Sequence, residues 1–178
     1  MGLFDDVPAS PETGPRGGPW ERPRDEFPAV AVSALLLART DVVAVGVTAV
    51  WAFTTGFEFW IKAQFRESGR ALENNPDDRS LHVGVQFADG RRVADVGAVP
   101  GSAGSESAGL IMRPVSFGGG MLQRNRSYWV HPLPPPGPVT FACRWAAFGI
   151  PEQRADVGGD LITAAAGRSV RLWPGTGD

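Results

Sequence analysis

The sequence predicts an all-β protein, an antiparallel β-sandwich of immunoglobulin-like type with seven to nine strands and one short C-terminal helix. Three observations support this fold class. Short segments alternate apolar and polar residues with a period of two, turn residues separate them, and no helix follows each strand as in a βαβ repeat. The same pattern also allows a β-barrel, which is the alternative fold.

Residues 127–145, SYWVHPLPPPGPVTFACRW, contain two predicted strands joined by a proline-rich corner. Every second residue of the later strand shares one face, which carries Val139, Phe141, Cys143 and Trp145. We expect this face to point into the core. The prolines hold φ at about −65° and donate no backbone hydrogen bond, which predicts a rigid surface loop rather than a ligand for an aromatic groove.

Residues 57–66 form the clearest predicted strand. One face would carry Phe57, Phe59, Ile61, Ala63 and Phe65, and the other Glu58, Trp60, Lys62, Gln64 and Arg66. We expect the first set to lie in the core and the second in solvent, with Glu58 as a solvated carboxylate.

Residues 29–38 and 42–53 predict two further strands, with a turn at residues 39–41. In the second of them the bulkier face should point inward, and it would carry Val43, Val45, Val47, Trp51 and Phe53. A three-residue loop ending at Gly56 with positive φ would pair Trp51 with Phe59. A two-residue turn would shift the register by one residue and expose Trp51 beside Trp60; we favour the first arrangement.

The remaining segments complete the predicted sheets. Residues 81–95 indicate a second hairpin around Asp89-Gly90, and residues 96–110 a mobile Gly/Ser/Ala loop. Strands are expected at residues 110–117 and 152–157. Asp160 would be the N-cap of a helix over residues 161–168, whose Leu161, Ala164 and Ala165 would touch the sheet.

Length and composition favour a single domain. The chain has 178 residues, of which 1–27 are rich in proline, glycine and charge. Such a segment buries too little apolar surface to offset its ordering entropy, so we expect a disordered tail. Residues 28–178 would form the β-sandwich domain.

Charge and cysteine usage exclude several function classes. With a net charge of −2, the chain has no broad basic field for nucleic acid or an anionic membrane. Cys143 is the only cysteine, so no internal disulfide and no cysteine metal cage can form, and two histidines cannot fill a zinc site alone. We therefore predict no metal and no cofactor. The first ten residues, MGLFDDVPAS, contain neither a basic leader nor a signal-length apolar run, so we expect a cytoplasmic protein.

Three blocks carry a resemblance to a known group: residues 35–59, LLLARTDVVAVGVTAVWAFTTGFEF; residues 81–92, LHVGVQFADGRR; and residues 129–152, WVHPLPPPGPVTFACRWAAFGIPE. They resemble a group of uncharacterised β-rich proteins from high-GC actinobacteria. That group has no assigned activity, so the resemblance implies a shared β-rich domain and no catalytic or binding residue.

Catalytic chemistry has weak support in the sequence. A hydrolase would need His82 or His131 as its base, but His82 has outward parity and His131 lies beside the proline corner. Cys143 has inward parity and is expected to be an inert core thiol. We therefore assign no catalytic residue.

Trp60 is the one residue that the solvated face does not explain, because an indole in solvent needs a cover or a partner. Trp20 or Trp173 of the same chain could cover it. Otherwise the face with Glu58, Trp60, Lys62, Gln64 and Arg66 is a binding surface. The leading hypothesis is a non-enzymatic module that binds a protein partner or forms a homo-oligomer; a carbohydrate-binding module is the alternative, and a hydrolase the further alternative.

Overall fold

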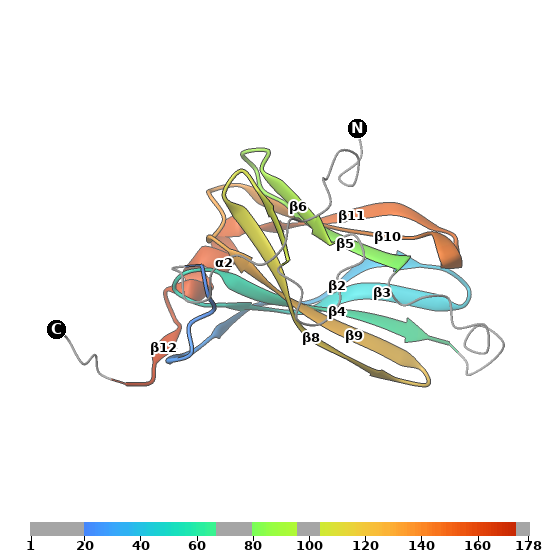
Figure 1. Ribbon diagram of the computed structural model, residues 1–178, viewed down its shortest axis with the longest axis horizontal. Coiled ribbons are helices and arrows are strands. Elements are labelled where there is room, and N and C mark those ends of the chain that lie inside the picture. Colours follow the sequence, from blue (N-terminus) through green and yellow to red (C-terminus); the bar gives the residue numbers. More distant parts are fainter. Residues whose placement is uncertain (1–19, 67–79, 96–103, 174–178) are drawn as a thin grey trace.

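The computed structural model of the chain describes residues 20–66, 80–95 and 104–173. Two sheets lie one above the other in it (Figure 1). The six-stranded sheet has the order β2 (Ala29–Arg39), β3 (Val43–Ala52), β4 (Phe57–Phe65), β9 (Gln123–His131), β8 (Leu110–Gly120), β7 (Ser105–Ser107). The four-stranded sheet has the order β11 (Ile150–Gly158), β10 (Pro138–Trp145), β5 (Leu81–Gln86), β6 (Arg92–Asp95). A separate ribbon pairs β1 (Glu26–Phe27) with β12 (Val170–Arg171).

Every strand pair in these sheets is antiparallel, so the predicted antiparallel sandwich is confirmed. The two main sheets contain ten strands, against the seven to nine expected. The addition is the three-residue β7, which lies in a segment expected to be a loop. The immunoglobulin-like assignment stays a prediction.

The residues predicted to face the core in β4 and β10 are buried. Phe57, Phe59, Ile61, Ala63 and Phe65 are buried, as are Val139, Phe141, Cys143 and Trp145. A period of two places these side chains on one face of each strand, and the two faces meet between the sheets.

The β3–β4 hairpin differs from the favoured prediction. Trp51 lies opposite Glu58, not Phe59, because Thr54 and Thr55 form a two-residue turn in which Phe53 N–H donates to the Gly56 carbonyl at 2.8 Å. Farther along, the register shifts between Val47 and Ala49, so that Thr48 is an extra residue in β3. Such a bulge reverses which parity faces inward.

Trp51 is therefore on the outside, and Val50 and Ala52 are buried in its place. The expectation for Gly56 is also wrong, since its φ is not positive. A Cβ at this glycine would lie 2.3 Å from the Val130 carbonyl oxygen. Close approach of β9, and not turn conformation, requires glycine here.

The C-terminal helix α2 (Gly159–Ala166) begins two residues earlier than predicted. Its N-cap is Gly158, which has no side-chain cap, so the prediction of Asp160 as N-cap is wrong. Two overlapping stripes at i, i+3 and i+4 begin at Leu161 and at Ile162, and the sequence pattern does not decide between them. Leu161 and Ala164 point outward, contrary to the prediction, whereas Ala165 is buried as predicted, together with Ile162 and Ala166. Through this face α2 packs on β2 and β3.

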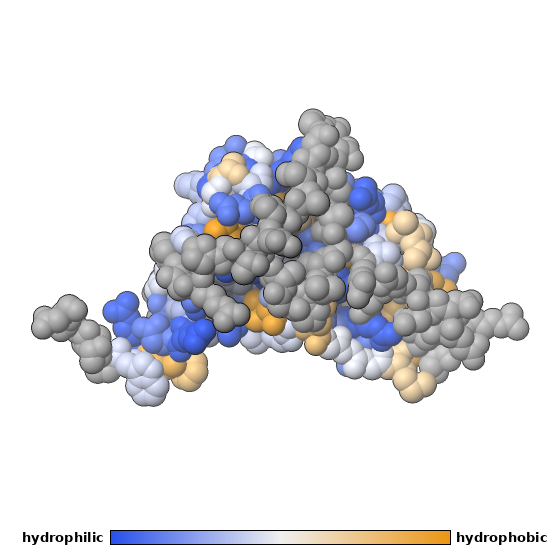
Figure 2. All heavy atoms as spheres, in the orientation of Figure 1, coloured by the Kyte–Doolittle hydropathy of each residue, from blue (hydrophilic) through white to orange (hydrophobic). Residues whose placement is uncertain are grey.

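Polar and apolar residues alternate in small areas over the surface of the domain. Outside the grey residues, the face drawn in Figure 2 shows small apolar patches among polar ones, with no single broad apolar band. This distribution is normal for a folded domain, in which isolated apolar side chains remain at the surface.

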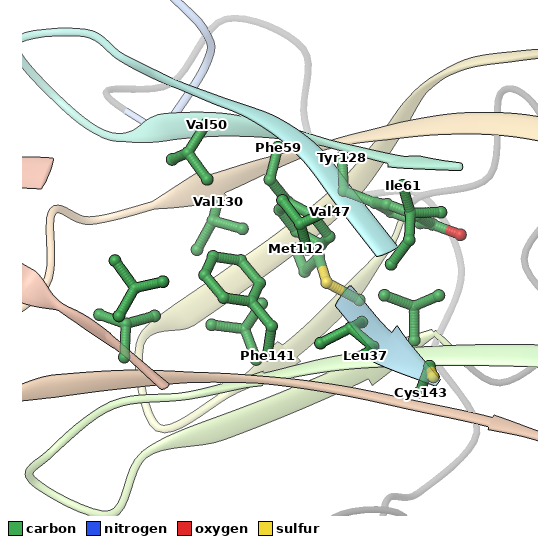
Figure 3. Packing of buried hydrophobic residues seen from close by; sticks show 14 of the residues in the cluster. Leu37, Val47, Val50, Phe59, Ile61, Met112, Tyr128, Val130, Phe141 and Cys143 are labelled. Carbon is green, nitrogen blue, oxygen red and sulfur yellow. The ribbon is translucent and has the colours of Figure 1, made fainter. Parts of the chain in front are cut away.

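Aromatic rings fill the core between the sheets. Figure 3 shows Phe141 of β10 pointing toward the residues that β4 and β9 contribute. The Phe141 ring centroid lies 5.2 Å from that of Phe59 and 6.3 Å from that of Phe57, in edge-to-face geometry. Burial of each such ring contributes roughly 1.5–3 kcal/mol to the free energy of unfolding.

Candidate functional site

The outer face of the six-stranded sheet carries the predicted binding residues. Glu58, Trp60 and Lys62 of β4 alternate with the buried rings, and their cross-strand partners in β9 are Trp129, Ser127 and Asn125. The two-residue turn and the Thr48 bulge add Trp51 of β3 to this face.

Trp51 and Trp60 form a ring pair on this outer face. Their centroids are 5.5 Å apart and the rings are tilted by 57°. Both indoles are partly buried. Such aromatic pairs add about 0.5–1.5 kcal/mol to stability, beyond the free energy gained from burying their apolar surface.

Two aliphatic side chains of β2 continue the apolar surface. Val30 lies opposite Trp51, and Leu36 lies opposite Gly46 of β3. Val30 is 58% exposed and Leu36 is 59% exposed. Between them and the indoles, β3 presents the small residues Ala44, Gly46 and Ala49. This surface, with Val30, Leu36, Trp51 and Trp60 as its large side chains, is the docking face.

The other part of the outer face is covered by residues 20–26, which belong to the segment predicted to be a disordered tail. Trp129 Nε1 donates to the Trp20 carbonyl at 2.7 Å, and the Trp129 ring meets Phe53 edge-on at 5.5 Å. Glu26 accepts a hydrogen bond from the Thr54 backbone N–H at 3.0 Å, which holds the segment against the β3–β4 turn.

Glu58 is not solvated, contrary to the expectation from its parity. Arg22 pairs with its carboxylate, and the Glu58 side chain is only 1% exposed. The Arg22 guanidinium also lies over the Phe53 ring, 5.9 Å from its centroid. Parity alone places Glu58 outside, but a distant segment of the chain then covers it.

Of the two tryptophans expected as covers, Trp173 is 68% exposed beyond β12 and does not cover Trp60. Trp20 contacts Trp129 through its carbonyl. Buried polar atoms without a hydrogen-bond partner gather in this region among the described residues: Trp20 Nε1, Trp60 Nε1, Glu58 Oε1 and Ser127 Oγ. Folded proteins leave few such atoms, so this part of the sheet has unused hydrogen-bonding capacity.

The end of the docking face near the β2–β3 turn is basic. Arg39 and Arg66 line a cavity of about 470 Å³, together with Asp41, Gln64 and the neighbouring backbone. Lys62 lies on the same face, opposite Gly46. Of the predicted site residues, Lys62, Gln64 and Arg66 thus lie together at this end, whereas Glu58 lies at the covered end.

A second polar cluster lies between the sheets, and the alternation of apolar and polar residues along the strands did not predict it. The Tyr128 hydroxyl donates to Asp95 Oδ2 at 2.5 Å, and Arg126 Nη1 donates to the Leu81 carbonyl at 3.0 Å. All three polar side chains are at most 3% exposed. Burial and the Asp95 carboxylate raise the pKa of the Tyr128 phenol above its ordinary value. The tyrosine is therefore a neutral donor that helps to hold a buried carboxylate in place.

The residues that a hydrolase would use are not brought together. Cys143 lies between the sheets, and burial raises the pKa of its thiol to about 12. His82 lies on the opposite, outer parity of β5, where burial and the Arg144 guanidinium lower its pKa. His131 Nδ1 is 2.8 Å from the Thr55 carbonyl oxygen. A thiol that is neutral at physiological pH and faces away from the histidine is a poor nucleophile.

No protein-family model, curated protein or solved structure matches this chain. The resemblance to the actinobacterial group stays a prediction. In the described ranges, no helix has the length and apolar character needed to cross a membrane. Over the same ranges, no three His, Cys, Asp or Glu side chains gather in a way that could hold a metal ion.

Substitution of Arg22 by alanine should destabilise the fold, because it leaves the buried Glu58 carboxylate without its cation. We expect a loss of about 1–3 kcal/mol in chemical denaturation. Arg154→Ala is the matched control: Arg154 is 39% exposed against 43% for Arg22, but its partner Glu152 is 19% exposed. Its loss should be below about 1 kcal/mol. Adding Glu58→Gln to Arg22→Ala should recover part of the stability, and equal losses for the two arginines would contradict this account.

Titration of Tyr128 should be delayed in the folded protein. It is the only tyrosine, so phenolate absorbance reports this residue alone. The unfolded chain in urea should titrate near pH ~10. The folded chain should not, and its stability should fall as pH rises above about 10, since only the unfolded state releases the proton there. A phenolate signal from the folded protein near pH ~10 would show that Tyr128 is not buried against Asp95.

Proposed function

We propose that this chain is a cytoplasmic, non-enzymatic module that binds a protein partner on the docking face. One observation carries the proposal: the Trp51–Trp60 ring pair shares the outer face of the sheet with Val30, which lies opposite Trp51, and with Leu36, and both aliphatic side chains stay more than half exposed. Tryptophan is among the residues most enriched at the energetic centres of protein interfaces. Aliphatic neighbours would exclude water around it when a partner binds.

The surface between the large side chains suits a flat partner. The side chains on this part of β3 are short: they are Ala44, Gly46 and Ala49. Another protein surface could therefore come close to the sheet backbone there. Face-to-face packing of sheets at about 10 Å uses this kind of surface.

Charge favours a partner that carries carboxylates around an apolar centre. Arg39, Lys62 and Arg66 lie at one end of the face, although the whole chain has a net charge of −2. A second copy would present the same cations, and like charges across an interface are costly. We therefore favour a different, acidic protein over a homo-oligomer.

A protein surface fits the indoles better than a sugar ring does. A carbohydrate platform uses an exposed, flat aromatic face. Here the two rings are tilted by 57° and partly buried, and Trp60 Nε1 is buried as well. This geometry supports an anchor inside an interface.

Trp60→Ala should weaken partner binding by about 2 kcal/mol or more in binding free energy. Leu36→Asp should weaken binding similarly, because it places a carboxylate on the apolar centre without touching the core. Trp173→Ala, which removes an indole exposed outside the docking face, is the matched control. Affinity capture with quantitative mass spectrometry compares the variants, and circular dichroism checks that each is folded.

Recovery of the same partners by wild type, Trp60→Ala and Leu36→Asp would refute binding through this face. Light scattering after size exclusion tests the homo-oligomer: a wild-type dimer that Leu36→Asp converts to a monomer would identify a second copy as the occupant and refute our preference for a different protein.

A further inference from the structure

A second candidate site lies over β8 and β9, on the part of the outer face that residues 20–26 cover. An open surface cavity of about 270 Å³ is lined there by residues of two origins: Glu21, Arg22 and Arg24 before β1, and Arg113, Pro114, Val115 and Trp129 of the sheet. Arg113 lies opposite Trp129 in the β8–β9 register, so its side chain leaves the outer face beside the indole. Residues 21–24 close the other side.

Three guanidinium groups meet at this cavity. Arg22 is already paired with Glu58, outside the set of residues that line the cavity. Neither Arg24 nor Arg113 forms an ion pair in the part of the chain that the structure describes. The one carboxylate in the lining is that of Glu21, so positive charge is in excess.

Arg113 also has an unused donor. Its Nε atom is buried and has no hydrogen-bond partner among the described residues. A buried N–H without an acceptor is unfavourable, and for a charged group the penalty is larger. Folded proteins commonly meet such a demand with a bound ligand or an ordered water.

The structure assigns an oxyanion-binding site to the cavity between Arg22, Arg24 and Arg113, for the carboxylate or phosphate group of a small organic ligand. Guanidinium groups present forked donors that match two oxygens of such a group. Pro114, Val115 and the Trp129 ring form an apolar wall that would contact the body of the ligand. The volume is at the small end of ligand sites, which favours a ligand the size of a simple aromatic acid over a nucleotide.

This site does not depend on the proposed function. The docking face involves β2, β3 and β4, whereas the oxyanion site uses β8, β9 and residues 21–24. Loss of one can therefore be measured while the other is intact.

Isothermal titration calorimetry on the full chain tests the assignment with three probes: acetate, benzoate and inorganic phosphate, at constant ionic strength set with chloride. We expect benzoate to bind with a dissociation constant on the order of 1 mM or below, and more tightly than acetate because of the apolar wall. Phosphate binding tighter than benzoate would identify a phosphate ester as the ligand class. The reverse order would identify a carboxylic acid.

Arg113→Gln should weaken the preferred probe about tenfold, which is the effect of losing one charge-assisted hydrogen bond. Arg24→Gln should weaken it in the same direction; since Arg24 is exposed, this variant should keep the fold. Arg154→Gln is the control, because Arg154 is an exposed arginine of β11 in the four-stranded sheet, outside both candidate sites.

Three results would overturn the assignment. They are no binding of any probe, equal affinity of wild type and both Arg113→Gln and Arg24→Gln, or an equal loss in Arg154→Gln. The last would show attraction to the general surface charge and not to this cavity.

Discussion

The register of the β3–β4 hairpin determines both surfaces of the six-stranded sheet. The Thr54–Thr55 turn sets Trp51 opposite Glu58, and the extra residue at Thr48 restores Val43, Val45 and Val47 to the inside. Without the bulge, one half of β3 would present the wrong face to the core. With it, β3 contributes small and β-branched residues to the core, and the one large ring of the strand, Trp51, is outside.

The register of the β3–β4 hairpin also places the two indoles of the docking face side by side. Trp51 can meet Trp60 only because both lie on the outer face, and the separate β4–β9 register places Glu58 opposite Trp129 on that face. The covered end then forms around them: Trp129 donates to the Trp20 carbonyl and Arg22 pairs with Glu58. The chain between these contacts and β1 brings Arg24 to the cavity that Arg113 lines. A local turn and a single inserted residue thus position the apolar surface, and the packing of residues 20–26 on β8 and β9 adds a basic cavity to the same sheet.

Much of the fold could be predicted from alternation. The faces of β4 and β10 follow a strict period of two, so Phe59, Phe141 and Cys143 were placed correctly. Thr48 carries no signal for a bulge, however, and Thr54-Thr55 lacks the glycine or asparagine of common two-residue hairpins, so the position of Trp51 was wrong. The prediction for Leu161 was wrong because its i, i+3, i+4 stripe overlaps the one that begins at Ile162, and the pattern alone does not show which stripe meets the sheet.

The candidate site was predictable only in part. Trp60 was recognised because an indole at a solvent-facing position is unusual. The burial of Glu58 depends on Arg22, 36 residues earlier in the chain, and no local pattern reports such a contact. Likewise, Arg113 is 89 positions after Arg24 (113 − 24), and only the packing of the tail on the sheet brings them to one cavity.

Proton–proton NOEs from Trp51 test the central claim most directly, because they report which face of β3 carries this ring. The account predicts NOEs between the indoles of Trp51 and Trp60, with the Val50 methyl groups giving NOEs to core residues. NOEs from Trp51 to Phe141, with none to Trp60, would place Trp51 between the sheets and contradict the register on which the docking face depends.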